Sequence, residues 1–267
     1  MKVACIQLSC DENIDLNYQK VIYFINKAIK NKAELIITPE ATAILTDSKK
    51  KLYKKSYNMR NDPLIKKIKE ISKKNKKWIL IGSLFIKDKQ TLKNRSIMIN
   101  PKGNIEAYYD KINMFDVKLN YNEKYEESKT FTAGKKIKTV DLPWGRLGMT
   151  ICYDLRFPEI YRNLSQKNLN FISIPSAFTK ITGKKHWLAL LKARAIENFC
   201  YIFAPNQTGK NTKNRTTFGH SAIISPDGKI LNIKKNGIGI IYANIDVEAP
   251  TRLRKIIPSL KLKKIKS

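Results

Sequence analysis

Apolar residues recur along the chain in two alternating patterns, and their alternation predicts the order of the elements. Short apolar runs bounded by polar or turn-forming residues are typical of buried strands, whereas apolar positions three and four residues apart are typical of amphipathic helices. The runs predict strands at 3–8, 34–38, 78–85, 95–100, 105–109, 147–152, 171–175, 201–205, 221–225, 230–233 and 238–245. The helical spacing predicts helices at 15–30, 63–74, 158–166, 184–199 and 247–256.

Three of the predicted helices carry an apolar stripe that would face a sheet. In the helix at 15–30 the stripe comprises Leu16, Ile22, Ile25 and Ile29. In the helix at 63–74 it comprises Leu64, Ile65, Ile68 and Ile71, and in the helix at 184–199 it comprises Trp187, Leu190, Leu191 and Ala195. Turns at 101–104 and 226–228 connect hairpins within this alternation. Strands that alternate with helices and also form hairpins predict an α/β sandwich with mixed sheets.

The pattern runs through the whole chain without a linker rich in Gly, Ser or Pro. A chain of 267 residues, 42% of them hydrophobic, is long enough to bury one large core. We therefore expect a single domain over residues 1–267, in which residues 258–267 form a basic C-terminal tail.

The chain is strongly basic, with 52 Lys and Arg residues against 22 Asp and Glu and a formal net charge of +30. Such a balance is also found in polyanion-binding proteins. The cations here are mostly lysines spread over the predicted helices and the tail, however, and nucleic-acid-binding surfaces need basic and aromatic residues gathered together. Lys, Asn and Ile, whose codons are rich in A and T, are all abundant. We therefore interpret the charge as solvated surface and expect no specific nucleic-acid partner.

Cysteine usage and the apolar runs bear on the compartment. Cys5, Cys10, Cys152 and Cys200 show no Cys-x-x-Cys spacing, and two histidines add no zinc-site pattern, so we expect no metal and no cofactor. The N-terminal apolar run is too short for a secretory signal, and the run at 78–86 is too short to span a bilayer. We expect a cytoplasmic protein with no membrane partner.

Three residues with reactive side chains each follow or end a predicted strand. Glu40 follows the second strand, Lys111 follows the strand at 105–109, and Cys152 ends the strand at 147–152. If these strands are neighbours, their carboxyl ends bring a carboxylate, an ammonium and a thiol together, at the edge where α/β sheets bind ligands. The helix that begins at Pro158 would also favour the thiolate form of Cys152.

This trio suits amide hydrolysis. The thiol attacks the carbonyl, the carboxylate carries the proton to the leaving nitrogen, and the lysine stabilises the oxyanion. Each residue also has a plainer interpretation: Glu40 as a surface charge or a neighbour of a helix cap, Lys111 as one of many surface lysines, and Cys152 as an inert buried thiol. Cys5 and Cys200, in or beside apolar strands, fit that last interpretation.

Three segments that occur together and in order carry a more specific signal. They are Thr-Pro-Glu at 38–40, Tyr-Asp-Lys-Ile-Asn-Met-Phe-Asp-Val at 109–117, and Ile-Cys-Tyr-Asp-Leu-Arg-Phe-Pro-Glu at 151–159. With them the chain, from Val3 to Asp246, resembles the nitrilase (carbon–nitrogen hydrolase) superfamily. The resemblance implies a four-layer αββα sandwich with mixed β-sheets, a catalytic triad of Glu, Lys and Cys, and a homodimer or larger homo-oligomer.

The same resemblance assigns roles to individual residues. Glu40, Lys111 and Cys152 match the triad, and Glu127 stands where the superfamily has a second active-site glutamate that positions the lysine and the substrate. One departure is Asn113, which stands where many relatives have His. It bears on a contact near Lys111 and removes no member of the triad.

Further segments resemble one branch, the small omega-amidases and deaminated-glutathione amidases. They lie at 175–178, 181–183, 186–187, 193–197 and 217–221. The insert at 209–216 and the basic ending at 252–264 resemble the deaminated-glutathione amidase more closely. This implies a small-molecule amide substrate, deaminated glutathione, hydrolysed through a Cys thioester acyl-enzyme with release of an amine or ammonia. Omega-amides of 2-oxo acids and N-carbamoyl amino acids are the alternative substrates, and a nitrile fits the branch less well.

Arg156 points to a substrate that carries a carboxylate. It lies close to Cys152 in a chain that otherwise favours lysine, and the planar guanidinium of arginine binds a carboxylate through two parallel hydrogen bonds. The alternative is a structural ion pair with Asp154 or Glu159, which are close enough in sequence to reach it.

The resemblance adds Thr182 as a hydroxyl partner for the same end of the substrate. Tyr153 and Phe178, in the matching segments, are further substrate-binding candidates. We interpret His186 and His220 as structural. A papain-like peptidase would need a catalytic histidine and a Cys-Gly-Ser-Cys-Trp type of segment, and the sequence offers neither.

Overall fold

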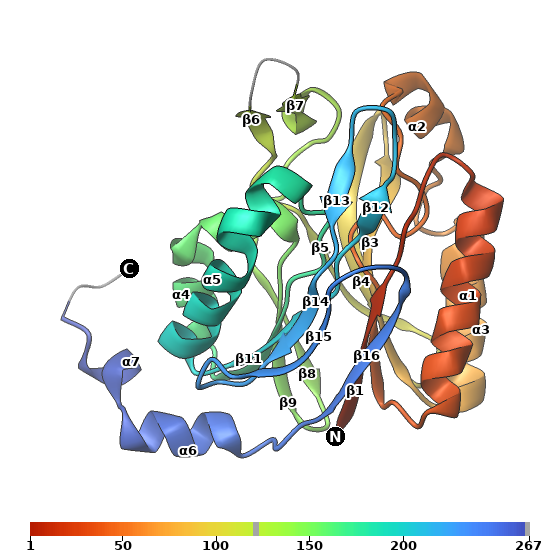
Figure 1. The fold of residues 1–267 in the computed structure, drawn as a ribbon. Helices are drawn as coiled ribbons and strands as arrows, with labels where there is room; N and C mark the ends of the chain where they lie inside the picture. Colours follow the sequence, from red (N-terminus) through yellow and green to blue (C-terminus); the bar gives the residue numbers. More distant parts are fainter. Residues whose placement is uncertain (120–122, 265–267) are drawn as a thin grey trace.

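The computed structural model describes residues 1–119 and 123–264 as two facing β-sheets enclosed by helices (Figure 1). The first sheet has the order β16-β1-β2-β3-β4-β5 and the second the order β15-β14-β11-β10-β9-β8. The first comprises β1 (Lys2–Gln7), β2 (Leu35–Ile37), β3 (Trp78–Asp88), β4 (Thr91–Ile99), β5 (Ile105–Asp110) and β16 (Gly239–Asn244). The second comprises β8 (Lys138–Leu142), β9 (Gly145–Met149), β10 (Leu169–Ser173), β11 (Tyr201–Ala204), β14 (Ser221–Ile224) and β15 (Ile230–Lys234).

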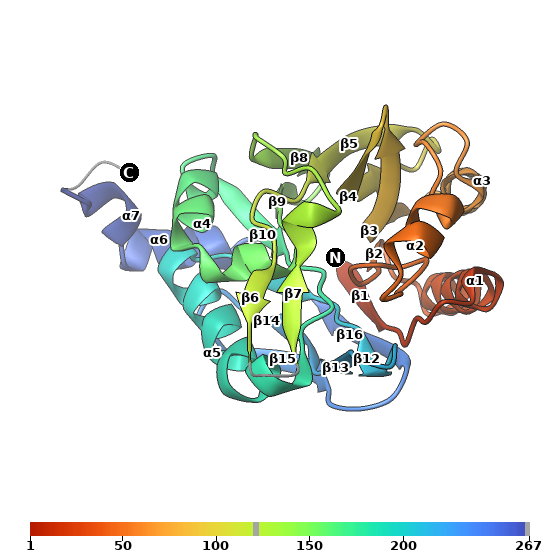
Figure 2. The same cartoon turned by 90° about the horizontal axis from the view of Figure 1, so that it is seen from above.

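Helices cover the outer face of each sheet. The helices are α1 (Ile14–Lys30), α2 (Lys49–Lys55), α3 (Pro63–Asn75), α4 (Pro158–Ser165), α5 (Lys180–Asn198), α6 (Ala249–Ile256) and α7 (Ser259–Leu262), with 3-10 turns η1 (Glu127–Lys129) and η2 (Cys152–Arg156). In Figures 1 and 2, α1 and α3 lie against the first sheet, and α4 and α5 lie against the second. The predicted four-layer αββα sandwich is confirmed.

Both sheets are mixed, as predicted. In the first, β1, β2 and β3 run parallel while β16, β4 and β5 pair antiparallel with their neighbours. In the second, β9, β10 and β11 run parallel while β8, β14 and β15 pair antiparallel. Because parallel strands of one sheet end at the same edge, the loops after them gather at one end of the sandwich.

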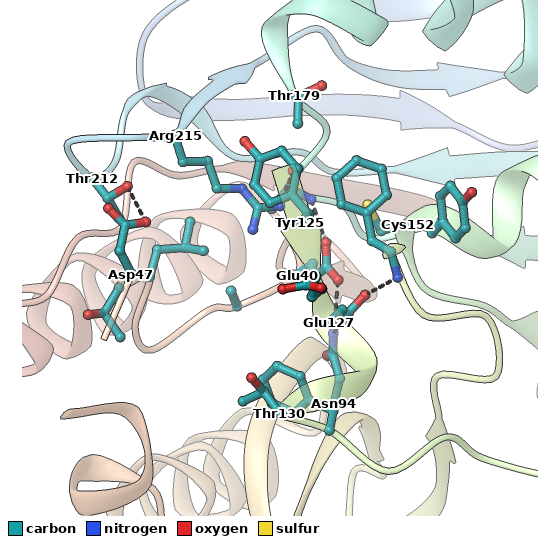
Figure 3. Close-up of a pocket in the computed structure, with 18 of the residues that line it drawn as sticks. Glu40, Asp47, Asn94, Tyr125, Glu127, Thr130, Cys152, Thr179, Thr212 and Arg215 are labelled. Atoms are coloured by element: carbon teal, nitrogen blue, oxygen red, sulfur yellow. Dashed lines mark hydrogen bonds between the residues drawn. The ribbon is translucent and has the colours of Figure 1, made fainter. Parts of the chain in front are cut away.

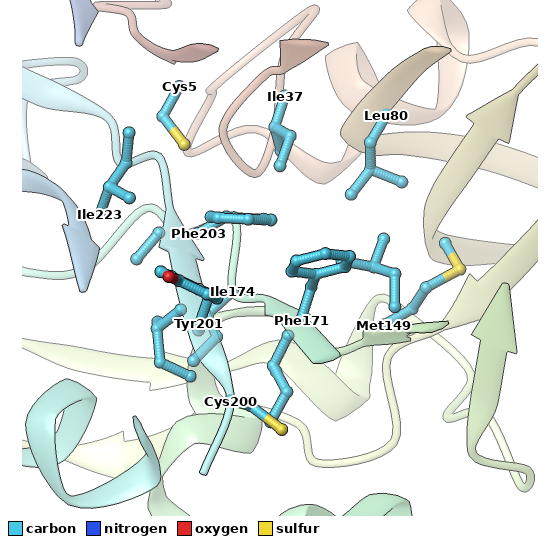
Figure 4. Packing of buried hydrophobic residues seen from close by; sticks show 14 of the residues in the cluster. Cys5, Ile37, Leu80, Met149, Phe171, Ile174, Cys200, Tyr201, Phe203 and Ile223 are labelled. Atoms are coloured by element: carbon cyan, nitrogen blue, oxygen red, sulfur yellow. The ribbon is translucent and has the colours of Figure 1, made fainter. Parts of the chain in front are cut away.

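The main core lies between the two sheets. It is formed by every second side chain of the strands, because successive side chains point to opposite faces of a sheet. Cys5, Ile37 and Leu80 point from the first sheet toward Phe171 and Met149 of the second (Figure 4). The alternate residues of the same strands point outward and pack against α1 and α3. This double burial explains why these strands are continuous apolar runs instead of alternating apolar and polar residues.

Helix α3 matches the prediction closely, whereas α1 corrects it. The stripe of α3 is buried, and the Asp62 side chain caps the helix by accepting from Ile65 N at 2.9 Å. In α1, the predicted core residue Leu16 is 47% exposed. The buried residues of α1 are Asn17, Val21, Phe24, Ile25 and Ala28.

Asn17 explains why α1 buries a different face from the one predicted. Its Nδ2 donates to the carbonyl oxygens of Asp11 at 2.9 Å and Ala43 at 3.0 Å. A polar residue therefore occupies a buried position because two loop carbonyls need a donor there. The hydrophobic pattern of the sequence cannot predict a polar residue that is buried for this reason.

Other differences concern the ends of elements. The strand predicted at 147–152 ends at Met149, and α5 begins at Lys180, where Thr179 caps it. Strand β8, helix α2 and two short ribbons were not predicted; the ribbons are β6 (Asp116–Lys118) with β7 (Lys124–Glu126), and β12 (Thr208–Lys210) with β13 (Thr216–Phe218). The predicted tail contains α7, and its residues 265–267 lie outside the described part of the chain. None of the helices within the described ranges combines the length and apolar character needed to cross a membrane.

Candidate functional site

Glu40, Lys111 and Cys152 meet at one end of the sandwich, and they come from both sheets. Glu40 follows β2 and Lys111 follows β5 in the first sheet, whereas Cys152 follows β9 in the second. The sequence suggested neighbouring strands along one sheet edge. The structure instead brings the three together across the gap between the sheets.

The two sheets approach closely at this point. Gly82, at an irregularity of β3, has so little space that an added Cβ would collide with the Thr38 carbonyl oxygen and the Pro175 side chain. Thr38 leads into Glu40, and the carbonyl oxygen of Pro175 accepts from Cys152 N at 3.0 Å. Because Gly82 has no side chain, the segment that leads into Glu40 can lie close to Pro175, whose carbonyl holds the backbone of Cys152.

Lys111 is buried between two glutamates. Its Nζ lies 3.0 Å from Glu40 Oε1 and 2.7 Å from Glu127 Oε2, and the lysine side chain is only 2% exposed. Burial alone would lower the pKa of Lys111, but the charges of Glu127 and Glu40 outweigh it and raise the pKa above its usual value. Lys111 is therefore an ammonium ion at neutral pH.

Glu40 is held as a carboxylate by its surroundings. Burial acts to raise its pKa, but the positive charges of Lys111 and Arg215 outweigh that effect, and the net shift is downward. Its Oε2 accepts from Ala177 N at 2.8 Å. Asn94, which the sequence did not single out, bridges the two carboxylates by donating from Nδ2 to Glu40 Oε1 at 2.9 Å and to Glu127 Oε1 at 3.1 Å.

Cys152 differs from the prediction in its charge state. Burial, together with the negative charge of Glu40, raises the pKa of the thiol far above its usual value. The expected thiolate is wrong because the side chain is buried and η2 separates it from the start of α4. A neutral thiol thus lies near an ionised carboxylate, an arrangement suited to proton transfer during attack.

The backbone around the thiol and the base is strained. Cys152 has a φ of 47° and Ala41, next to Glu40, has a φ of 56°. Residues with a side chain in this left-handed region typically cost about 1–3 kcal/mol each and cluster at functional sites. Hydrogen bonds to both loops hold these conformations in place.

A buried aspartate connects the segments of Lys111 and Cys152. Asp154 accepts from Tyr109 Oη at 2.8 Å, from Ile151 N at 2.9 Å, and from Asn113 N at 3.0 Å and Nδ2 at 2.9 Å. Asn113, noted as a departure from many relatives, therefore contacts Asp154 and fixes the loop after β5 to the loop after β9. The residue at position 113 therefore helps to set how the Lys111 loop and the Cys152 loop lie relative to each other.

A cavity of about 350 Å³ opens over the reactive side chains (Figure 3). Tyr153, Phe178 and Thr182 line it, as does Glu127. Glu123 to Glu126, from the β6–β7 ribbon, form part of its wall. Three of the four substrate-binding candidates from the sequence therefore face the same space as Cys152.

Arg156 lies beside this cavity and not among its lining residues. Its Nη1 is 3.2 Å from His186 Nδ1, and its guanidinium lies 5.3 Å from the Phe178 ring centroid. Burial and the charge of Arg156 lower the pKa of His186, so the neutral ring can accept from the guanidinium. No ion pair joins Arg156 to Asp154 or Glu159 among the described residues.

Arg215 is a cavity-lining cation that the sequence did not single out. It belongs to the connection between β12 and β13, lines the cavity, and lies over the Tyr125 ring at 5.4 Å (Figure 3). Its only signal in the sequence was its place in the 209–216 insert. Across residues 1–119 and 123–264, no group of three or more His, Cys, Asp or Glu side chains is placed to hold a metal ion.

Comparison with known proteins identifies the family. The model of the carbon-nitrogen hydrolase family matches residues 2–255. The chain belongs to the carbon–nitrogen hydrolase family.

Relatives of this carbon–nitrogen hydrolase match over most of its length. It is 34% identical to the deaminated glutathione amidase of Yersinia enterocolitica over 97% of this chain and 91% of that protein. It is 36% identical to the deaminated glutathione amidase of Synechocystis, over 96% of each. The prediction of an enzyme that hydrolyses carbon–nitrogen bonds of amides is confirmed.

Solved structures agree with this assignment. The crystal structure of the C. elegans NitFhit protein superposes with a TM-score of 0.93 at 32% identity, covering 98% of this chain and 65% of that one. Nit3 of Saccharomyces cerevisiae, a member of branch 10 of the nitrilase superfamily, superposes with a TM-score of 0.88 at 28% identity, over 99% of this chain and 97% of that one. The carbon–nitrogen hydrolase described here therefore spans about two-thirds of NitFhit and nearly all of Nit3.

Proposed function

We propose that this carbon–nitrogen hydrolase is a deaminated glutathione amidase that works through a Cys152 acyl-enzyme. The observation that carries the mechanism is the meeting of Cys152, Glu40 and the buried Lys111 in one cavity, where Lys111 Nζ lies 3.0 Å from Glu40 Oε1. The substrate is supported by full-length similarity to enzymes of that name. Deaminated glutathione is a 2-oxo acid joined by an amide bond to cysteinylglycine, and it has a carboxylate at each end.

Acylation begins with transfer of the thiol proton from Cys152 to Glu40. The sulfur attacks the amide carbon, and the carbonyl oxygen becomes an oxyanion that the ammonium of Lys111 stabilises. Protonated Glu40 then gives its proton to the amide nitrogen. The carbon–nitrogen bond breaks, cysteinylglycine leaves as an amine, and the 2-oxo acid stays on Cys152 as a thioester.

Deacylation reverses these roles. Glu40 accepts a proton from a water molecule as the water attacks the thioester carbon, and the sulfur leaves with that proton restored. Glu127 positions Lys111 throughout, a role supported by its contacts with the lysine Nζ at 2.7 and 3.0 Å. Asn94 keeps the two carboxylates at a fixed separation.

The 2-oxo acid end of the substrate is assigned to one side of the cavity. Thr182, Tyr153 and Phe178 line that wall, and Arg156 lies behind Phe178 and Tyr153, with its guanidinium within 6 Å of each ring. We assign the carboxylate of the 2-oxo acid to Arg156 and Thr182. Arg156 would have to turn toward the cavity to reach this carboxylate, and one exposed hydrogen bond to His186 holds it in its present position.

The remaining expectations concern the whole protein. We propose that residues 1–267 act as one carbon–nitrogen hydrolase domain, supported by the family match over 2–255 and by the single core between the sheets. We propose a homodimer or larger homo-oligomer, and a cytoplasmic location, which suits four cysteines that are all free in the described chain.

A substrate panel tests the proposed function. Purified enzyme is given deaminated glutathione, 2-oxoglutaramate, an N-carbamoyl amino acid and a simple nitrile, and the amine or ammonia released is measured. We expect the highest kcat/KM for deaminated glutathione, and none of this activity in Cys152→Ala, which lacks the nucleophile. A higher kcat/KM for 2-oxoglutaramate would reassign the enzyme as an omega-amidase, and full activity of Cys152→Ala would overturn the mechanism.

A further inference from the structure

Arg215 is a cation in the cavity that forms no ion pair with a carboxylate of the described chain, although its charge acts on Glu40 and helps to lower the pKa of that carboxyl. Lys111 has Glu40 and Glu127, and Lys124 has Glu126 at 3.0 Å. No ion pair involves Arg215 among the described residues. Its Nη2 donates to the carbonyl oxygen of Ala177 at 2.7 Å, and its buried Nε has no hydrogen-bond partner within the described chain.

Two other carboxylates that line the cavity, Asp47 and Glu123, accept hydrogen bonds from other groups. Asp47 accepts from Thr212 Oγ1 at 2.8 Å and from Asn214 N at 3.3 Å, and Glu123 accepts from Tyr125 Oη at 2.7 Å. A partly buried guanidinium with unused donors is an incomplete arrangement, since buried charges and donors are normally paired. An anion entering the cavity would complete it.

We propose that Arg215 binds a second carboxylate of the substrate, on the leaving-group side of the scissile amide. The inference rests on the proposed function, in which deaminated glutathione places one carboxylate on each side of the bond that breaks. Arg156 comes from η2 and is assigned to the acyl side. Arg215 comes from the β12–β13 ribbon, and in the view of Figure 3 it lies between Cys152 and the Asp47–Thr212 pair.

Two further contacts suit Arg215 for this task. The Tyr125 ring centroid lies 5.4 Å from its guanidinium carbon, a cation–π contact that stabilises the positive charge. The Ala177 carbonyl fixes one Nη, which leaves the other donors for a carboxylate. Arg215 would therefore determine specificity between amides whose leaving group ends in a carboxylate and amides that release ammonia or a neutral amine.

The competing interpretation is that Arg215 only positions the base. Ala177 accepts from Arg215 and its own N–H donates to Glu40, so loss of Arg215 could shift the carboxylate. Such a positioning role would affect all substrates alike. A leaving-group role would affect only substrates that carry the distal carboxylate, and this difference forms the test.

Steady-state kinetics would use three substrates: deaminated glutathione, its analogue with a C-terminal glycinamide, and 2-oxoglutaramate. We expect Arg215→Met to lower kcat/KM for deaminated glutathione about 10- to 100-fold, the usual effect of losing a charged hydrogen-bonded contact. We expect changes below about threefold for the other two substrates. Arg215→Lys should recover part of the loss, and Lys210→Met, which removes a charge from the exposed end of the same ribbon, should behave like wild type.

The wild-type enzyme gives a check that needs no folded variant, because it should itself prefer the free acid over the glycinamide by a similar factor. Equal kcat/KM values for those two substrates, or an equal fall for all three in Arg215→Met, would overturn the inference and leave the proposed function standing. A wild-type enzyme that hydrolyses neither deaminated glutathione nor its glycinamide analogue would overturn the proposed function, and the inference with it.

Discussion

Replacing Lys111 by Met should lower the free energy of unfolding at neutral pH. The variant should also gain stability as the pH falls from 7 to 5.5, whereas acid only destabilises wild type. The side chain is 2% exposed, and its Nζ lies 3.0 Å from Glu40 and 2.7 Å from Glu127. Methionine fills a similar space but leaves two carboxylates, bridged by Asn94, without the positive charge that contacts them both.

The size of the effect follows from these distances. At an effective dielectric constant of about 20, each carboxylate attracts the ammonium by roughly 5–6 kcal/mol, and this gross term is partly offset by the desolvation of the lysine. Breaking one side of a buried pair typically costs about 3–5 kcal/mol. The variant can also respond by protonating one carboxylate. For a group with an ordinary pKa of about 4.3, that protonation costs about 3.7 kcal/mol at pH 7 and about 1.6 kcal/mol at pH 5.5.

The sign of the pH dependence distinguishes the two proteins. In wild type the pKa of Glu40 is lowered, so its contribution is complete above the unfolded pKa and is lost only as the pH falls below about 4.3. In Lys111→Met the folded pKa of one carboxylate is raised, so the variant recovers stability as the pH falls from 7 to 5.5. We expect a deficit of about 3–4 kcal/mol at pH 7 that shrinks by about 2 kcal/mol at pH 5.5.

Urea unfolding followed by far-UV circular dichroism at both pH values measures this deficit. The matched control is Lys51→Met, which removes an ion pair of 2.6 Å to Glu12 at an exposed site and should leave the free energy of unfolding close to that of wild type at either pH. The reasoning is refuted if Lys111→Met lies within about 1 kcal/mol of wild type at pH 7, or if its deficit is unchanged at pH 5.5.

Three further predictions concern activity and reactivity. Because Glu40 is ionised and Cys152 carries its proton, kcat/KM should be nearly constant from pH 5.5 to 8; a tenfold rise per pH unit would instead indicate attack by a preformed thiolate. Arg156→Lys should lower kcat/KM about 10- to 100-fold for an acid amide and hardly at all for its methyl ester, whereas an equal fall for both would limit Arg156 to holding its loop. Iodoacetamide should modify Cys152, which lines the cavity, before Cys5 and Cys200, which have no exposed surface; peptide mass spectrometry that finds Cys200 modified first would contradict this.

The sequence predicted the layers well because burial on both faces leaves a strong signal. Continuous apolar runs marked the central strands, and helix α3 followed its periodic stripe through Leu64, Ile65, Ile68 and Ile71. Prediction failed where a single tertiary contact outweighed the pattern. Asn17 is buried because two loop carbonyls need its amide, and Leu16 is exposed as a consequence.

The sequence predicted which residues form the site but not how the two sheets bring them together. The strand ends located Glu40, Lys111 and Cys152, yet no local pattern shows that the third belongs to a facing sheet. The charge state of the thiol depends on burial and on Glu40, both of which are set by that assembly. Arg215 lies in a connection with no periodicity, and only the fold shows that it reaches the cavity.

The charges at the floor of the cavity explain why a buried lysine between two glutamates suits the proposed reaction. In the resting site, Glu40 and Glu127 carry two negative charges, Lys111 carries one positive charge, and the Cys152 thiol is neutral. When the thiol proton moves to Glu40 and the sulfur attacks, the negative charge lost from Glu40 reappears on the substrate oxygen. The net charge around Lys111 is therefore unchanged, and the same ammonium faces the anion before and after the step. A preorganised cation that needs no rearrangement as charge moves past it is the arrangement that lowers a barrier most effectively. A thiolate in the resting site would instead place a third negative charge beside one lysine, which is why burial that keeps Cys152 neutral assists this chemistry.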